Sequence, residues 1–474
     1  MRFRISLLLL AIFFALFACT QHLPAPGCTD DDSGRAYFTG SSASFSNGTT
    51  IPDRCIDGER LEEQTCGSPT ARASVIYTCP YGCSNGACIL PYTGDLVPKA
   101  NGPDVEGMGG FDSFVLGFMK KWNLPGASLA VTKNGKLVYA RGYGFADVGK
   151  NTPVTPESRF RIASLSKPIT AAATLKLVEE GKLDLDTRAF EILGYTQDQF
   201  ADGRAYDITI RQLLQHTGGW DRDMSYDPMG GFRWVAEMTH VDSPVGCPEI
   251  LDYVVKNKKL DFPPGTRSAY SNFGYCVLGR VIENVSGEGY EGYIKTHVLA
   301  PMGITRMQLG NTLSRAENEV SYYTWPGANL SKSVFEDALV PGPYGEYYLE
   351  GMSPSGGWTG TPADYARFVT RIDGTGGHLF TPETEAAMQA PPDFWKNEAF
   401  YYGMGWFIWP RGDSATWTHS GAMQGVSSYV IRTYDGYTMV VFFSSWPREY
   451  SSQLFAEVDP GLWEAFYGVD EWPD

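Results

Sequence analysis

Positive charge is scarce in this sequence. Of its 474 residues, 38 are Lys or Arg and 54 are Asp or Glu, which gives a formal net charge of −16. Nucleic-acid binding depends on clustered positive charge that faces the phosphates, so we expect no nucleic-acid partner. The composition also gives no reason to expect electrostatic binding to an anionic membrane surface.

Histidine is scarce too. The six histidines are scattered along the chain, and no His-Glu-x-x-His pattern places two zinc ligands on one face of a helix. A zinc hydrolase is therefore disfavoured. We expect neither a metal nor another cofactor.

Long apolar runs are limited to the start of the chain. Arg2 and Arg4 precede an apolar segment over residues 5–17, which is too short to span a bilayer and ends in Leu16-Phe17-Ala18-Cys19. This ending is similar to a bacterial lipobox, although Phe17 stands where a small residue is usual. We expect residues 1–18 to be a signal peptide, Cys19 to be lipidated, and residues 19–27 to be a tether.

An ordinary secretory signal that is cut nearby is the alternative to lipidation. Both interpretations export the chain, either to the cell envelope as a lipoprotein or to the periplasm or the medium. Cys19 is the one expected attachment to a membrane, because no other stretch is long and apolar enough to span one.

Cysteine is rare in most of the chain but crowded near its start, where six cysteines lie within residues 28–88. An even number of clustered cysteines behind an export signal predicts three disulfides, with zinc binding at Cys79, Cys83 and Cys88 as the alternative. We expect a small disulfide-rich module over residues 28–90 and a linker over residues 91–105. The module could contact a cell-surface component or act as a stalk. Cys247 and Cys276 are expected to form a further disulfide.

The rest of the chain has the patterns of an α+β domain over residues 106–470. Apolar residues recur at helical spacing over 111–122, and Asn134-Gly135 joins two alternating runs as in a β-hairpin. Asp435-Gly436 predicts a second hairpin near the other end. Helical patterns fill the middle, for example over 166–181. We therefore expect one antiparallel sheet that is built from both ends of the domain, flanked by helices, with an additional all-helical region.

Several weaker patterns complete the expected fold. Residues 402–409 and 415–419 have the composition of strands, and residues 310–360 form a long stretch rich in Gly, Pro and aromatic residues that should be functional or should contain undetected elements. A closing helix is expected over 454–466, interrupted at Pro460-Gly461.

One pair of residues carries the strongest chemical signal. Ser164 and Lys167 are three residues apart at an expected helix start, so the amine can lie beside the hydroxyl, and no other Ser-x-x-Lys occurs in the chain. Serine is a poor nucleophile unless a base takes its proton, and a lysine with a lowered pKa is such a base. The alternative is that Ser164 caps the helix and Lys167 is a solvated residue of its first turn.

Two later segments could complete a catalytic site. Tyr270 could relay a proton, with its pKa lowered by the Lys167 ammonium, and Asn272 could orient Lys167 or a substrate amide. His419 precedes Gly421 and Ala422 on an expected strand, where glycine permits close approach of a substrate. The structural alternatives are a packed tyrosine with a capping asparagine, and a histidine that is satisfied within a strand.

Together these segments resemble the serine β-lactamase and penicillin-binding-protein superfamily. Phe160-Arg-Ile-Ala-Ser164-Leu-Ser-Lys167 is similar to its first motif, and Tyr270-x-Asn272 is similar to the second motif of the class C β-lactamase branch. His419-Ser-Gly421 stands in the place of the Lys-Thr-Gly third motif. The similarity covers about residues 110–465 and includes Leu213-Leu-Gln-His-Thr-Gly-Gly, whose histidine we assign a structural role.

The resemblance implies a β-lactamase/transpeptidase-like fold and an acyl-enzyme mechanism. Ser164 would be the nucleophile, Lys167 and Tyr270 would share the proton transfers, and the backbone N–H groups of Ser164 and Ala422 would form the oxyanion hole. Asn272, His419 and Gly421 would bind substrate.

The substrate would be a small ester, amide or peptide. Because the third motif lacks the lysine that meets a substrate carboxylate, an esterase-like enzyme is favoured over a D-alanyl-D-alanine carboxypeptidase or a class C-like β-lactamase. A pseudoenzyme that binds peptidoglycan or acts as a sensor is the non-catalytic alternative.

Overall fold

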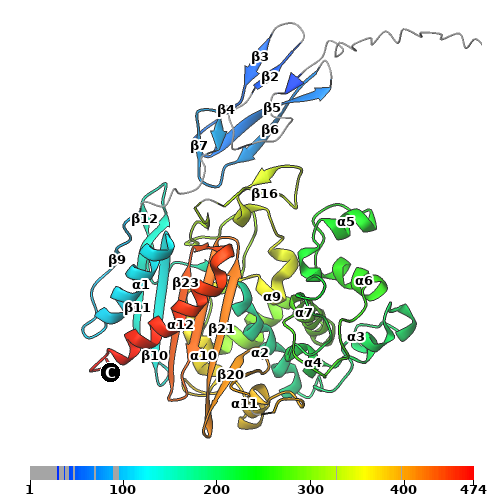
Figure 1. The fold of residues 1–474 in the computed structure, drawn as a ribbon, viewed down its shortest axis with the longest axis vertical. Helices are drawn as coiled ribbons and strands as arrows, with labels where there is room; N and C mark the ends of the chain where they lie inside the picture. The colour runs from blue at the N-terminus through cyan, green and yellow to red at the C-terminus, as the bar shows by residue number, and fades with distance from the viewer. Residues whose placement is uncertain are drawn as a thin grey trace, which may run out of the picture.

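The computed structural model describes residues 29–30, 37, 42–45, 49–68, 71–88, 96–326, 328–396 and 398–473. A small β-rich module stands at one end of a larger body in which helices pack on a sheet (Figure 1). The predicted signal peptide, Cys19, the tether and Cys28 lie outside the described residues. No helix in the described ranges is long and apolar enough to cross a membrane.

The larger body is built around one antiparallel sheet of nine strands. Its order is β12 (Thr152–Pro153), β11 (Lys136–Asp147), β10 (Gly126–Lys133), β23 (Tyr437–Phe443), β22 (Val426–Arg432), β21 (Ser414–Met423), β20 (Phe407–Arg411) and β19 (Tyr401–Tyr402), and β9 (Ala100–Asn101) also pairs with β11. The two predicted hairpins lie side by side because β10 pairs with β23. Both ends of the domain therefore meet in one sheet, as predicted, and β9 shows that part of the expected linker belongs to this sheet.

Helices cover both faces of the sheet (Figure 1). They are α1 (Gly109–Trp122) and α12 (Ser451–Tyr467) on one face, and α2 (Ser166–Glu179) and α10 (Pro362–Ile372) on the other. Val441 of β23 packs in the apolar cluster of α1 and α12, whereas its neighbour Phe442 packs in the cluster of α2 and α10. Successive side chains of a strand point to opposite faces, so a continuous apolar strand suits a sheet that is buried on both sides.

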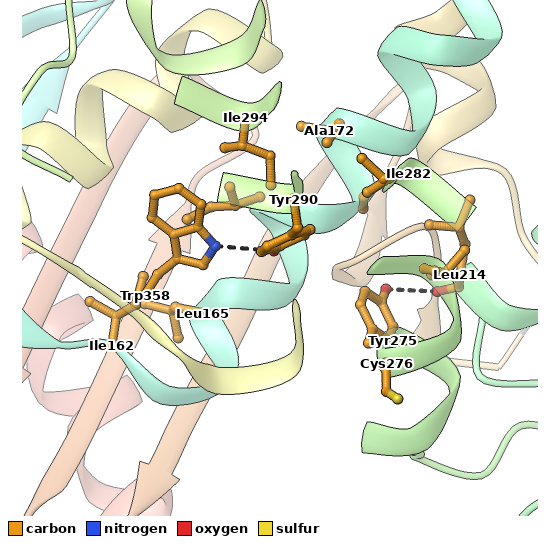
Figure 2. Packing of buried hydrophobic residues seen from close by; sticks show 14 of the residues in the cluster. Ile162, Leu165, Ala172, Leu214, Tyr275, Cys276, Ile282, Tyr290, Ile294 and Trp358 are labelled. Carbon is orange, nitrogen blue, oxygen red and sulfur yellow. Dashed lines mark hydrogen bonds between the residues drawn. The ribbon is translucent and has the colours of Figure 1, made fainter. Parts of the chain in front are cut away.

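A helical region packs against α2. Its helices are α3 (Ala189–Ile192), α4 (Ile210–Leu214), α5 (Trp234–Thr239), α6 (Cys247–Asn257), α7 (Asn272–Ser286), α8 (Tyr290–Ile294), α9 (Ser353–Gly356) and α11 (Pro382–Gln389). Figure 2 shows two buried aromatic residues of this core with their polar atoms satisfied: Trp358 Nε1 donates to the Tyr290 hydroxyl at 3.0 Å, and the Tyr275 hydroxyl donates to the Leu214 carbonyl at 3.0 Å. Large aromatic side chains can fill a core in this way when their polar ends find partners.

The long stretch 310–360 contains short elements that the sequence pattern did not reveal. They include β15 (Tyr323–Thr324), β16 (Ser331–Lys332), β17 (Leu339–Val340), β18 (Trp358–Gly360) and α9. β18 pairs with both β13 (Phe160–Arg161) and β14 (Gln308–Leu309), so this stretch reaches the chain just before Ser164.

Two expectations about glycine-containing segments are wrong. Residues 402–409 are not one strand, because a turn separates β19 from β20; there Gly405 has φ 91°, and a Cβ would lie 2.8 Å from the Cβ of Ala171 on α2. Helix α12 is continuous through Pro460 and Gly461. A Cβ at Gly461 would overlap the ring of Phe114, so this glycine permits close packing of α12 on α1.

The cysteine-rich module consists of short strands tied by disulfides. Cys55 is bonded to Cys83 and Cys79 to Cys88, and Cys66 is also disulfide-bonded. The strands are β1 (Thr29–Asp30), β2 (Ser42–Ser44), β3 (Thr50–Pro52), β4 (Arg54–Cys55), β5 (Arg60–Ser68), β6 (Ala71–Thr78), β7 (Cys83–Ser84) and β8 (Ala87–Cys88). The disulfides confirm the expected bridging and leave these thiols unavailable as zinc ligands.

The module is also packed on the larger body. Cys88 shares an apolar cluster with Val340 of the β16–β17 hairpin. The Tyr81 hydroxyl donates to the backbone carbonyl of Tyr322 at 2.6 Å, and Lys150 forms an ion pair with Glu59 at 2.8 Å. The module therefore packs on the domain through buried side chains. A stalk would not require such contacts.

Candidate active site

Ser164 lies in a tight turn between β13 and α2. The turn is a single 3-10 segment, η1 (Ala163–Leu165), and α2 begins directly after it. Ala163 has a left-handed φ of 48°. That conformation is unfavourable for a residue with a Cβ, and residues held in it cluster at functional sites. The backbone thus turns sharply just before Ser164, which remains partly exposed.

Arg161 anchors the chain that enters this turn. Its side chain is fully buried, donates to the Pro343 carbonyl at 2.7 Å and the Asn311 carbonyl at 2.8 Å, and lies 4.3 Å from the centre of the Tyr322 ring. Its backbone N–H donates to the Tyr322 hydroxyl at 2.7 Å. Arg161 does not stand out in the sequence, because nothing local distinguishes a buried arginine from a solvated one. Tyr81 of the cysteine-rich module also contacts Tyr322. Tyr322 therefore links the module to the segment that leads into the Ser164 turn.

Lys167 lies in the first turn of α2 with its side chain fully buried. Its Nζ is 3.2 Å from Ser164 Oγ, 2.6 Å from Asn272 Oδ1 and 2.8 Å from the carbonyl oxygen of Ser355 on α9. In the described part of the chain, Lys167 forms no ion pair with a carboxylate. The amine beside Ser164 is therefore shielded from water. It makes no direct contact with an opposite charge of the described residues.

Burial lowers the pKa of Lys167 well below its usual value. The charge of Arg222 lowers this pKa further, whereas the charge of Asp227 raises it. A neutral amine has two N–H donors and one lone pair. The carbonyl oxygens of Asn272 and Ser355 can take both donors, since neither oxygen can donate in return. The lone pair is then left for the Ser164 hydroxyl, which is the arrangement of a general base.

Tyr270 shares the Ser164 hydroxyl with Lys167. The two side chains, Tyr270 and Ser164, are hydrogen-bonded, and Lys167 Nζ lies 4.6 Å from the centre of the Tyr270 ring. Burial raises the pKa of Tyr270 above its usual value, and this effect outweighs the Ser164 hydrogen bond and the charge of Arg222. The expectation that a Lys167 ammonium lowers this pKa is therefore wrong. Tyr270 retains its proton and can donate it.

Asn272 begins α7, and a carboxylate that the sequence pattern does not indicate fixes its orientation. Its Oδ1 accepts from Lys167, while its Nδ2 donates to Asp227 Oδ2 at 2.6 Å. Asp227 also accepts from the backbone N–H of Met229 at 3.0 Å. Because Asp227 precedes Pro228, its sequence suggests only a capped turn. Its role in the site depends on tertiary contact with Asn272.

Gly421 brings strand β21 against the nucleophile turn. A Cβ at this position would lie 2.5 Å from the Ile162 carbonyl oxygen and would overlap Ser428 Oγ. Only glycine permits so close an approach of strand and turn. The next residue, Ala422, is therefore near Ser164, and its backbone N–H remains our candidate for the oxyanion hole together with that of Ser164.

His419 is built into the wall of the site. The ring is 1% exposed; Nδ1 donates to the Ser420 carbonyl at 2.8 Å, and Nε2 accepts from the Tyr402 hydroxyl at 3.0 Å. Burial, with a contribution from Lys167, lowers the pKa of His419 to about 3, so the ring is neutral. Direct substrate contact, which we expected of His419, does not fit this geometry. Its visible role is to hold Tyr402.

His216 also lies at the site, although we expected a purely structural role for it. Its ring centre is 4.4 Å from that of Tyr270 and 4.3 Å from that of Tyr402, and Nδ1 accepts from the Ser271 backbone N–H at 3.2 Å. It thereby holds the turn that presents Tyr270 and Asn272. Nε2 has no hydrogen-bond partner among the described residues.

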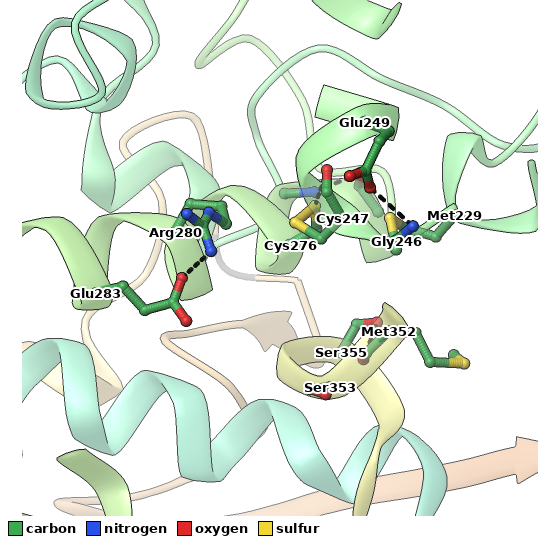
Figure 3. Close-up of a disulfide and its surroundings, with 12 residues drawn as sticks. Met229, Gly246, Cys247, Glu249, Cys276, Arg280, Glu283, Met352, Ser353 and Ser355 are labelled. Carbon is green, nitrogen blue, oxygen red and sulfur yellow. Dashed lines mark hydrogen bonds and ion pairs between the residues drawn. A yellow bond between two sulfur atoms is a disulfide. The ribbon is translucent and has the colours of Figure 1, made fainter. Parts of the chain in front are cut away.

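Cys247 and Cys276 form a disulfide that joins α6 to α7, the helix that Asn272 begins. Figure 3 shows this bond near Ser353 and Ser355 of α9, the segment whose carbonyl contacts Lys167. A cavity of about 590 Å³ next to the disulfide includes Cys247 and Ser353 in its lining but not Ser164 or Lys167. The disulfide therefore stabilises the framework behind the site.

A Gly-x-Ser-x-Gly pattern, which is typical of α/β-hydrolases, occurs at Gly82-Cys-Ser84-Asn-Gly86. It lies in the β7–β8 hairpin of the cysteine-rich module, between disulfide-bonded cysteines. The strand–turn–helix context that this motif needs for catalysis is not found there.

Comparison with known proteins agrees with this geometry. Residues 111–457 match the model of the Beta-lactamase family. Penicillin-binding protein 4* of Bacillus subtilis (strain 168) is 28% identical over 367 residues, which cover 75% of this chain and 76% of that protein. Protein flp of Staphylococcus aureus (strain NCTC 8325 / PS 47) is 26% identical over 68% of this chain, and the chain spans 59% of that protein's length.

A solved structure shows the same fold. The octameric penicillin-binding protein homologue from Pyrococcus abyssi superposes with a TM-score of 0.55 at 25% identity, over 74% of this chain and 77% of that one. The chain belongs to the β-lactamase family, in the superfamily of serine hydrolases that includes the penicillin-binding proteins.

Proposed function

We propose that this protein is an exported serine hydrolase that cleaves esters or amides through an acyl-enzyme, with short-chain esters as its best substrates. The observation that carries the proposal is the environment of Lys167. Its Nζ lies 3.2 Å from Ser164 Oγ, is fully buried, and has both N–H donors occupied by Asn272 and Ser355.

The first half of the reaction follows from this geometry. The Ser164 hydroxyl gives its proton to Lys167 Nζ while Oγ bonds to the carbonyl carbon of the substrate. The negative charge on the carbonyl oxygen is stabilised by the backbone N–H groups of Ser164 and Ala422. As the bond to the leaving group breaks, Tyr270 gives its proton to the departing oxygen or nitrogen and recovers one from Lys167.

The second half repeats these transfers with water. A water molecule gives a proton to the base and attacks the acyl carbon, and the Ser164 oxygen leaves and is reprotonated. Asn272, held by Asp227, keeps the Lys167 amine in place throughout.

The neutral residue at position 419 favours esters over β-lactams and D-alanyl peptides. His419 is buried with a pKa of about 3, so it supplies no positive charge for a substrate carboxylate. The similarity to Penicillin-binding protein 4* favours the alternative, a D-alanyl-D-alanine carboxypeptidase or class C-like β-lactamase. We expect hydrolysis of p-nitrophenyl butyrate and weak or absent turnover of nitrocefin.

Ser164→Ala tests the proposal. The variant should fold normally and lose ester hydrolysis by about three orders of magnitude or more. Wild-type ester hydrolysis in the variant would show that Ser164 is not the nucleophile. A fluorophosphonate probe that fails to label Ser164 in the folded wild type would favour a non-catalytic role in binding peptidoglycan or in sensing.

Export, lipidation at Cys19 and surface contact by the cysteine-rich module belong to the same proposal. The disulfides support export, because such bonds persist in oxidising compartments. Metabolic labelling with a fatty acid should mark the wild type and not Cys19→Ser. Absence of label from the wild type would leave an ordinary secretory signal as the interpretation.

A further inference from the structure

We infer that Arg222 selects substrates whose leaving group carries a carboxylate. This inference rests on the proposed acyl-enzyme function. It assigns a substrate feature to a residue outside the three motifs, one that the sequence pattern did not suggest.

Arg222 presents its charge at the catalytic tyrosine. Its guanidinium carbon lies 4.8 Å from the centre of the Tyr270 ring. Arg222 is exposed, and within the described ranges of the chain it makes no ion pair or hydrogen bond. A guanidinium stacked on an aromatic ring keeps its N–H edges free for a ligand. A cation is therefore available beside Tyr270, and no carboxylate of the described residues pairs with it.

The loop that carries Arg222 is held in place on both sides. Before it, Asp221 is 7% exposed and pairs with Arg267 at 2.9 Å, and its backbone N–H donates to Asp261 at 2.8 Å. After it, the backbone N–H of Asp223 donates to Asp221 Oδ1 at 2.9 Å, and that of Ser225 donates to the Asp221 carbonyl at 3.0 Å. These bonds fix the backbone around Arg222, so the position of its charge does not depend on a free loop.

The proposed proton transfer from Tyr270 indicates that the leaving group is the part of the substrate near Arg222. Tyr270 donates to the leaving group in the proposed mechanism, so the leaving group must lie next to the Tyr270 hydroxyl. Arg222 stacks on the same ring. A carboxylate on the leaving group can therefore reach the guanidinium, and the planar fork suits a bidentate contact.

The charge distribution of the site supports this assignment. His419 on the sheet side is neutral, and Lys167 is buried with a lowered pKa. The cation of Arg222 lies beside Tyr270 on the loop side, so it serves a leaving group near Tyr270 and does not replace a charge at position 419 of β21. Asp227 is the nearby anion, but its Oδ2 accepts from Asn272 and its Oδ1 from the Met229 backbone N–H. It forms no ion pair with Arg222 among the described residues.

A matched pair of esters tests the inference. Phenyl butanoate and 3-(butanoyloxy)benzoate have the same acyl group and leaving phenols of similar acidity, and they differ in the carboxylate. We would measure kcat and KM for both with the wild type, Arg222→Gln, Arg222→Lys and the control Arg280→Gln, at a pH where the rate no longer changes. Arg280 is a half-exposed arginine paired with Glu283 outside the site.

The wild type should prefer the carboxylate ester, and Arg222→Gln should lower its kcat/KM about tenfold or more, mainly through KM. For phenyl butanoate the change should stay within about twofold. Arg222→Lys should keep part of the preference, and Arg280→Gln should keep all of it.

Equal losses on both esters, or no loss on either, would overturn the inference while leaving the acyl-enzyme intact. Failure of the proposed function has a different result: neither ester would be hydrolysed in a Ser164-dependent way. Unchanged thermal midpoints would show that the Arg222 variants are folded.

Discussion

Lys167 Nζ lies 3.2 Å from Ser164 Oγ, and its two other contacts within hydrogen-bond distance are carbonyl oxygens. A charged ammonium in this position would donate to all three oxygens. A neutral amine donates to two and accepts from the serine. Burial, which lowers the pKa of Lys167, favours this neutral form, which can act as a base.

The pH dependence of the reaction should report Lys167. Because burial lowers the pKa of Lys167 from 10.5, kcat/KM should rise with pH through a value well below 10.5 and then level off. Lys167→Met should lower kcat/KM by about three orders of magnitude. Lys176→Met, on the same helix but paired with Glu179, is the control and should keep wild-type kinetics. A variant of Lys167 that retains the wild-type pH profile would contradict this role.

Removal of the Asp227 charge should shift that profile toward lower pH. Asp227 raises the pKa of Lys167, so Asp227→Asn lowers this pKa further. The variant should also lose about tenfold in kcat, because Asn272 loses the acceptor that orients its amide. Arg222 lowers the pKa of Lys167, so Arg222→Gln should shift the profile toward higher pH.

Asp223→Asn provides the control for this experiment, since Asp223 is exposed on the same loop. Kinetics of all three variants over a range of pH measure the shifts. Shifts of Asp227→Asn and Arg222→Gln in the same direction would show that the two charges do not act on Lys167 as described.

A side chain at position 421 should damage both stability and catalysis. In Gly421→Ala the new Cβ would lie 2.5 Å from the Ile162 carbonyl oxygen, so strand β21 must move away from the nucleophile turn. We expect a loss of about 1–3 kcal/mol in the free energy of unfolding and a lower kcat. Chemical denaturation and ester kinetics measure the two effects.

Gly117→Ala is the matched control, because a Cβ there meets nothing within 4 Å and the residue is on the exposed side of α1. It should leave kcat unchanged and stabilise the helix by about 0.5–1 kcal/mol. Normal activity and stability of Gly421→Ala would argue against close contact between β21 and the turn.

Stability should fall in acid partly because of His419. Burial lowers the pKa of His419 from 6.5 to about 3, so between these values the unfolded chain binds a proton that the folded chain does not. The free energy of unfolding therefore decreases as pH falls through this window, by about 1.4 kcal/mol per pH unit for this group. His216, whose pKa burial also lowers, acts in the same direction.

In His419→Gln the slope of the free energy of unfolding against pH should fall by the contribution of about one proton between pH values of about 6 and 4. Urea denaturation at several pH values measures the slope. An unchanged slope would mean that His419 is protonated in the folded protein. The third motif would then carry a positive charge that could meet a substrate carboxylate.

Local patterns predicted the parts of the fold that local chemistry determines. Asn134-Gly135 and Asp435-Gly436 identified the two hairpins, and the spacing of Ser164 and Lys167 identified their contact. Gly461 was misinterpreted because a glycine that breaks a helix and a glycine that permits close packing look the same in a sequence. The difference depends on Phe114 of α1, which is far away along the chain.

The residues that tune the site could not be predicted in the same way. Asp227 acts through Asn272, Arg222 through the ring of Tyr270, and each contact joins segments more than 40 residues apart. The direction of the Tyr270 pKa was also wrong, because it depends on burial, which residue spacing does not reveal.

The central claim is that Ser164 carries the acyl group and that Lys167 activates it. The most direct measurement is intact-protein mass spectrometry after brief exposure to p-nitrophenyl butyrate, followed by peptide mapping. One butanoyl group should appear on Ser164 in the wild type, and none should appear in Ser164→Ala or, on the same timescale, in Lys167→Met. A butanoyl group on another residue, or equal acylation of Lys167→Met, would contradict the account.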